Sequence, residues 1–124
     1  MHQTDARRQE CLDRCQSCKE MCLASAVHCL DVGGRHAAPD HIRLLISCAE
    51  ICSTSARLML LGSDQEDRMC DVCADICETC ADACQIFDDD ELMQQCAESC
   101  RRCAESCREM AGMWSRSQMQ HAMR

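Results

Sequence analysis

The spacing of the cysteines constrains the fold of this chain more than any other feature of its sequence. The chain has 124 residues, and 16 of them are cysteine. Within each cysteine-rich segment, neighbouring cysteines lie three, four or seven positions apart, which returns a side chain to the same face of an α-helix. Each segment therefore carries one stripe of thiols. The four stripes are Cys11, Cys15, Cys18, Cys22 and Cys29; Cys48 and Cys52; Cys70, Cys73, Cys77, Cys80 and Cys84; and Cys96, Cys100, Cys103 and Cys107.

Three breaks divide the chain into four segments. Residues 33–39 include two glycines and end at Pro39, which suits the first turn of a helix. Gly62 interrupts the chain again, and the three aspartates of residues 88–90 place negative charge where a helix N-terminus favours it. The segments are rich in Ala, Glu, Leu, Met and Arg, which favour helix. We predict helices over residues 4–32, 39–61, 64–86 and 89–114, and a tail over residues 115–124.

The linkers between these segments are short, so successive helices should be antiparallel neighbours. The sequence therefore predicts an all-α, up-down-up-down four-helix bundle that forms a single domain over residues 1–124. In such a bundle the cysteine stripes occupy the inward positions. Ser63 and Glu66 have the spacing of a capping box at the start of the third helix.

Composition indicates a reduced, acidic protein. Aromatic residues make up only 2% of the chain, so something other than large rings must fill the core. The polar N-terminus has no export signal, and no stretch approaches the ~18 apolar residues of a membrane span. We therefore predict a cytoplasmic protein with reduced thiols and no membrane partner. The net charge of −8 argues against nucleic acid as a partner.

Several roles for so many cysteines are open. Disulfides within one stripe are disfavoured, because thiols at these spacings point the same way. A structural zinc site needs four ligands, usually on loops, whereas these rows supply many thiols on helices. Iron–sulfur clusters use loop motifs of different spacing. An electron-transfer protein with such clusters, or a general thiol buffer for zinc, remain as alternatives. Buried cysteine can also simply fill a core, but 16 aligned residues argue against that interpretation.

Copper(I) suits these rows best, because it is a soft ion that prefers thiolate and thioether ligands. A thiolate can bridge two coppers, so a ladder of thiols becomes a ladder of sites with a capacity on the order of 16 ions. Each copper that displaces one thiol proton leaves the net charge unchanged, which a buried site requires. We therefore predict a binding protein for many Cu(I) ions. The sequence has no nucleophile–base arrangement or phosphate loop that would indicate an enzyme.

The rows resemble those of the cysteine-rich copper storage proteins, a family of four-helix bundles. The resemblance is carried by the first row from Cys11 to Cys22, by Cys48-Ala49-Glu50-Ile51-Cys52, and by the two long rows of the third and fourth helices. It covers residues 8–110. It implies storage of copper(I) by core thiolates in the cytosol, exchange of copper with a donor or acceptor protein or chelator, and a homo-oligomer, commonly a tetramer.

The two ends of such a bundle should differ. One end gathers the start of the second helix and the start of the fourth, where His41 and Met93 continue the cysteine stripes. We predict that these residues admit copper, with His28 and His36 as further candidates, because imidazole and thioether bind copper(I) more weakly than thiolate. The alternative is that they are loop and cap residues. At the other end, the stripes finish in a predicted hydrophobic plug of Met59, Met110 and Trp114.

The second helix has another apolar stripe, formed by Leu44, Ile51 and Leu58 at heptad spacing. It cannot face the bundle axis together with Cys48 and Cys52. An exposed apolar row predicts an interface between subunits. Burial against a neighbouring helix at a flanking position is the alternative.

Overall fold

The computed structural model describes residues 3–122, with side chains for residues 6–112. The elements are α1 (Gln3–Val32), the short 3-10 helix η1 (Gly34–Ala37), α2 (Pro39–Leu61), α3 (Glu66–Gln85) and α4 (Glu91–Ala122). The predicted helix boundaries agree to within two residues, except at the end of α4. The predicted tail was wrong for residues 115–122, because α4 continues to Ala122.

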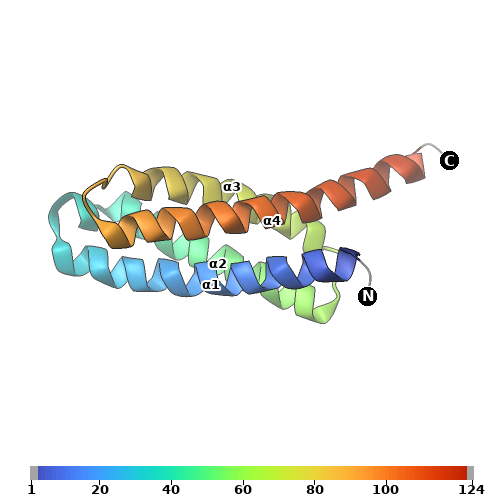
Figure 1. Ribbon diagram of the computed structural model, residues 1–124, viewed down its shortest axis with the longest axis horizontal. Helices are drawn as coiled ribbons and strands as arrows, with labels where there is room; N and C mark the ends of the chain where they lie inside the picture. Colours follow the sequence, from blue (N-terminus) through green and yellow to red (C-terminus); the bar gives the residue numbers. More distant parts are fainter. Residues whose placement is uncertain (1–2, 123–124) are drawn as a thin grey trace.

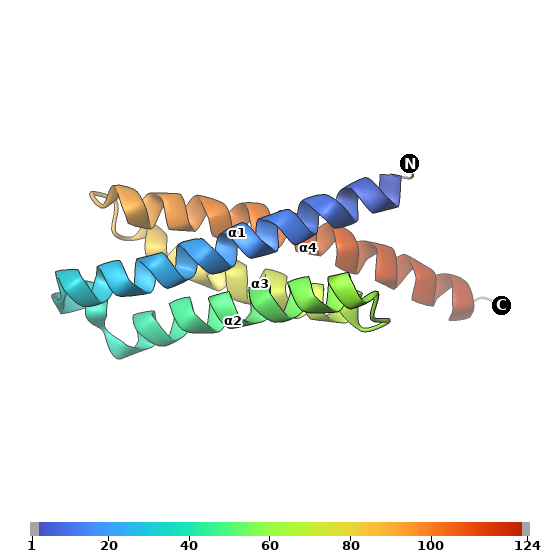
Figure 2. The ribbon, with the colours of Figure 1, turned by 90° about the horizontal axis from the view of Figure 1, so that it is seen from below.

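The four helices form an antiparallel bundle (Figure 1). Each helix packs on two neighbours, α1 on α2 and α4, and α3 on α2 and α4. The turned view places the α1–α2 and α3–α4 connections at one end, and the α2–α3 connection with both chain termini at the other (Figure 2). The predicted all-α, up-down-up-down bundle is therefore confirmed.

Local interactions explain where α2 ends and α3 begins. Gly62 adopts a left-handed conformation with φ 66°, and its N–H and that of Ser63 close the last turn of α2 on the carbonyls of Met59 and Leu58. The predicted capping box does not form. The Ser63 hydroxyl accepts a hydrogen bond from the N–H of Gln65, while the Glu66 carboxylate pairs with Arg8 of α1.

The core of the bundle consists mainly of sulfur and small side chains. All 16 cysteines are fully buried. Ala74 and Ala81 on α3 and Ala97 and Ala104 on α4 are buried at heptad spacing. Side chains this small let neighbouring helix backbones approach closely. Close approach explains how a bundle with almost no aromatic residues can fill its interior.

By length and composition, α2 is apolar enough to cross a membrane, so the sequence-based exclusion of any such stretch was wrong. Here α2 packs between α1 and α3 and carries Cys48 and Cys52 into the core. Its second stripe is partly buried, with Leu44 and Ile51 packed against the core. This arrangement supports burial at a flanking position, and the oligomeric state stays a prediction.

Candidate metal centre

The structure brings all 16 predicted thiol ligands into one buried row along the bundle axis. Every one is a free cysteine with no exposed surface. The stripes on α1, α3 and α4 extend over several turns, and Cys48 and Cys52 of α2 complete the middle. Because each stripe repeats every three or four residues, thiols of different helices meet at successive levels of the axis.

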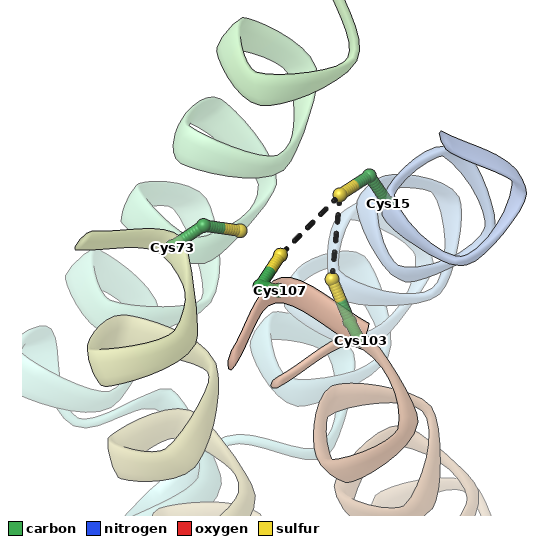
Figure 3. Close-up of side chains that lie close together, drawn as sticks. All are labelled: Cys15, Cys73, Cys103 and Cys107. Atoms are coloured by element: carbon green, nitrogen blue, oxygen red, sulfur yellow. Dashed lines mark hydrogen bonds between the residues drawn. The ribbon is translucent and has the colours of Figure 1, made fainter. Parts of the chain in front are cut away.

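One level shows how the thiols meet. Figure 3 draws Cys15 of α1, Cys73 of α3, and Cys103 and Cys107 of α4, whose sulfurs all lie within 4.8 Å of one another. The Sγ of Cys15 lies 3.6 Å from that of Cys103 and 3.8 Å from that of Cys107. These are contacts between thiols rather than disulfides, whose sulfurs lie about 2.05 Å apart.

The four-sulfur groups overlap along the axis. Cys73 and Cys103 also belong to a group with Cys52 and Cys77, and these last two belong in turn to a group with Cys18 and Cys48. The series runs from a three-sulfur group at one end to a four-sulfur group towards the other. Those two groups are Cys11, Cys70 and Cys107, and Cys18, Cys22, Cys48 and Cys100. Because neighbouring groups share ligands, this is a continuous array and not a set of separate sites.

Burial helps to raise the pKa of thiols in both halves of the array. A hydrogen bond with Cys103 and burial raise the pKa of Cys15 to about 11. Burial, together with the negative charge of Asp90, raises the pKa of Cys29 to about 11. Hydrogen bonds to Cys80 and Cys96 and burial also raise the pKa of Cys84. Neutral thiols pack as small apolar groups, so these three positions need no metal to compensate buried charge.

Two buried hydroxyls interrupt the thiol rows. Ser25 lies between Cys22 and Cys29 on the stripe of α1, and Ser55 follows Cys52 on the stripe of α2. Both are fully buried, and neither hydroxyl oxygen has a hydrogen-bond partner among the described residues. A buried polar group without a partner destabilises a fold by about 1–3 kcal/mol.

At one end, here called the mouth, the row finishes in three different ligand types. The Sγ of Cys29 lies 3.6 Å from Nε2 of His41 and 3.6 Å from Sδ of Met93. Met93 is fully buried and His41 nearly so. Burial, and after it the neighbouring His36, lower the pKa of His41, so its imidazole stays neutral near pH 7. Thiol, imidazole and thioether thus converge on one point, as the stripes predicted for His41 and Met93.

Phe87 covers the mouth. Its ring lies 4.1 Å from that of His36 and 5.1 Å from that of His41, measured between centroids. An open hollow of about 340 Å³ on the surface reaches both His41 and Phe87. The hollow reaches His41, which itself contacts the last thiol of the α1 row.

His28 and His36 do not join Cys29. Their Nε2 atoms lie 2.7 and 2.9 Å from one oxygen of Asp90. The other oxygen of Asp90 accepts a hydrogen bond of 3.2 Å from the N–H of Met93 and so caps α4. The hydrogen bond from His28 lowers the pKa of Asp90 to about 2. The aspartate run predicted a helix start, but nothing in its pattern pointed to two histidine partners.

The opposite end, here called the closed end, is finished by apolar and ion-paired groups. Met59 and Met110 are buried there, while the side chain of Trp114 lies outside the described residues. A guanidinium nitrogen of Arg8 lies 2.8 Å from the carbonyl oxygen of Met59 and 2.5 Å from the carboxylate of Glu66. Arg8 therefore joins the start of α1, the end of α2 and the start of α3.

Comparisons with known proteins agree with this geometry. A family model described as copper storage protein matches residues 4–112. A protein of Nitrosospira multiformis shares 46% identity over 88% of this chain and 98% of its own, with a TM-score of 0.83. Copper storage protein 3 of Bacillus subtilis, in its copper(I)-bound form, shares 35% identity over 85% and 98%, with a TM-score of 0.80.

A more distant relative is a cytosolic copper storage protein from Streptomyces lividans carrying five coppers. It shares 27% identity over 86% of this chain and 93% of its own, with a TM-score of 0.75. Among curated proteins, no relative matches the sequence.

Proposed function

Because the chain belongs to the copper storage protein family, we propose that it stores copper(I) in its thiol core and that all sixteen cysteines are ligands. The family match confirms the resemblance drawn from the cysteine rows. Storage, rather than catalysis, is the role that the family implies. The Streptomyces lividans relative described as cytosolic supports a cytoplasmic location for this protein as well.

The overlap of the sulfur groups is the observation that carries the proposal. Cys52 and Cys77 each belong to two four-sulfur groups, and Cys18 and Cys48 likewise. A shared thiolate is a bridging ligand, and copper(I) accepts bridging thiolates. Each incoming ion displaces a thiol proton, so the interior stays neutral as it fills. We expect a capacity on the order of 16 ions, one for each thiol.

The same overlap weighs against zinc and iron–sulfur clusters. A closed zinc site takes four ligands, so two zinc ions at adjacent groups would have to share Cys52 and Cys77. An iron–sulfur cluster must fit its inorganic core between its ligands, whereas the sulfurs at these levels already lie 3.6–4.0 Å apart. Copper(I) accepts few ligands and bridging thiolates, so closely spaced, shared thiols suit it.

We propose that copper enters at the mouth. His41 and Met93 lie against Cys29, the last thiol of the α1 row, and the surface hollow reaches His41. Weaker ligands at the edge can capture an ion and pass it to the stronger thiolates inside. A donor or acceptor protein, or a chelator, would exchange copper there. From the resemblance we further propose a homo-oligomer, such as a tetramer.

An anaerobic titration of the reduced protein with copper(I), against a competing chelator, tests the storage function. We expect uptake to continue beyond ten equivalents without visible absorption, because copper(I) has no visible d–d transitions. Replacing Cys52 or Cys11 with serine should each lower the capacity by about one ion, since capacity follows the number of thiols. Saturation of the wild-type protein at one or two equivalents would contradict storage, and visible colour on reconstitution with iron and sulfide would favour the iron–sulfur alternative.

A further inference from the structure

A second group of metal-ligating side chains lies beside the mouth, outside the thiol row. It consists of His28 from the last turns of α1, His36 from η1 and Asp90 at the start of α4. Both imidazole Nε2 atoms lie within 2.9 Å of the same Asp90 oxygen. Between 15 and 31% of each of these side chains is exposed, so the group lies at the surface of the protein.

From this convergence we propose that His28, His36 and Asp90 bind a divalent cation of the zinc type, separately from the copper(I) cargo. Two imidazole nitrogens and one carboxylate oxygen form the three-ligand set of open zinc sites, in which water fills the fourth position. The two imidazoles need only to draw away from the Asp90 oxygen for a cation to replace the two hydrogen bonds.

The donor atoms determine which ion fits. Copper(I) selects sulfur, and all the sulfur ligands belong to the row that ends at Cys29. A carboxylate with two imidazoles is a borderline set that suits divalent ions such as zinc(II). Exposed Asp88 and Asp89 stand next to Asp90 and add negative charge, which attracts a dication to this corner.

The orientation of Asp90 is fixed by a group outside the cluster. Its second oxygen accepts the N–H of Met93, which holds the carboxylate in place and leaves the first oxygen facing the two histidines. Hydrogen bonds of this kind orient metal-binding carboxylates and strengthen their sites. The three ligands come from α1, η1 and α4, so a bound cation would tie these segments together.

A cation bound to these three segments would change the rate of copper uptake. This consequence rests on the proposed function. Phe87 packs on His36, a ligand of the new site, and also on His41, a residue of the mouth. A cation that fixes His36 therefore also fixes the ring that covers His41. We expect zinc(II) to slow copper(I) uptake without changing the copper capacity.

The test uses cobalt(II) as a visible substitute for zinc(II), added to full-length, untagged protein already filled with copper(I). Nitrogen and oxygen ligands give cobalt(II) only weak d–d bands, whereas thiolates add intense near-ultraviolet charge-transfer bands. We expect one equivalent to bind with d–d bands alone, and His28→Ala or Asp90→Asn to weaken binding at least about tenfold. Asp88→Asn, which removes one charge from the same aspartate run, is the matched control and should bind within about twofold of wild type.

Equal binding by wild type, His28→Ala and Asp90→Asn would overturn the proposal, as would charge-transfer bands for the single equivalent. Asparagine still caps a helix, so Asp90→Asn should fold, and circular dichroism of each variant verifies it. The copper content of the same samples is measured separately. A failure of copper storage therefore appears as low copper content, and a failure of the divalent site as absent d–d bands.

Discussion

The two ends of the thiol row are built from similar core residues and finished by different chemistry. Each end buries a methionine on a cysteine stripe, Met93 at the mouth and Met59 at the closed end. At the mouth, the methionine sulfur contacts the last thiol, and an imidazole contacts the same thiol. At the closed end, Arg8 bonds to the carbonyl oxygen of Met59 and to Glu66.

This difference teaches that burial alone does not assign a function to a core residue. Met59 and Met93 are both almost completely buried and contribute similar packing energy. Met93 in addition places its sulfur 3.6 Å from a thiol, beside an imidazole that lines the surface hollow. The mouth places possible metal ligands against the last thiol, whereas the closed end is covered by an ion pair. The comparison is therefore tested best by changing matched residues at the two ends.

The largest expected effect comes from the two methionines. Met59→Ala and Met93→Ala should each lower the free energy of unfolding by about 2–5 kcal/mol, because each leaves a cavity in a packed core. Copper(I) uptake should slow about tenfold in Met93→Ala, equivalent to about 1.4 kcal/mol of barrier. It should stay within about twofold of wild type in Met59→Ala.

Chemical denaturation measures the stability of these two variants, and stopped-flow mixing with a copper(I) donor measures uptake. If both variants slow uptake equally, the rate reports general loosening of the bundle and the two ends are equivalent. Adding His41→Ala to Met93→Ala should slow uptake further while the final capacity stays nearly intact.

The fold and the thiol row were predictable, because a helix repeats every 3.6 residues and the cysteine spacing follows that period. Even His41 and Met93 were found this way, since they lie on the stripes. The end of α4 was missed because the prediction relied on the cysteine row, whereas residues 115–122 contain no proline or glycine to stop the helix.

Contacts between distant segments were not predictable. Asp90 lies 62 residues from His28 and 54 from His36, so no local pattern links them. The capping box at Ser63 failed for the same reason. A tertiary partner, Arg8, lies 58 residues away and takes the carboxylate of Glu66 that the local motif assigned to the backbone.

The ion pairs at the two ends should differ by a smaller amount in what they contribute to the free energy of unfolding. Arg8→Ala should lower the free energy of unfolding by about 1–2 kcal/mol, because it leaves the largely buried Glu66 carboxylate without its partner. Burial already raises the pKa of Glu66, so this variant should raise it further. Arg43→Ala near the mouth is the control, since the pair of Arg43 with Asp40 is well exposed and should contribute less than about 0.5 kcal/mol. If urea denaturation shows equal losses of stability in the two variants, the Arg8 pair stabilises the closed end no more than an exposed ion pair does.

The two unpaired hydroxyls give a pair of substitutions with a still smaller expected effect. Ser25 lies in the half of the bundle towards the mouth and Ser55 in the half towards the closed end. Ser25→Ala and Ser55→Ala should each stabilise the metal-free protein by about 1 kcal/mol, because each removes a buried hydroxyl with no partner. Thermal denaturation of the reduced protein measures this gain, and a loss of stability in either variant would mean that its hydroxyl is paired in solution.

The smallest expected effect concerns pH at the mouth. Burial lowers the pKa of His41 below its usual 6.5, so this imidazole remains a neutral ligand at pH 6.5, where a free one is half protonated. Below that pH the unfolded chain binds the proton more readily than the folded one, so the contribution of His41 to stability falls as the pH falls.

Thiol protonation affects uptake in wild type and in His41→Ala alike, so the ratio of their initial uptake rates isolates the imidazole. We expect that ratio to change by less than about twofold between pH 7.5 and 6.5. A ratio already halved at pH 6.5 would mean that His41 titrates like a solvent-exposed histidine, and the contrast between a buried ligand at the mouth and an ion-paired cap at the closed end would then be lost.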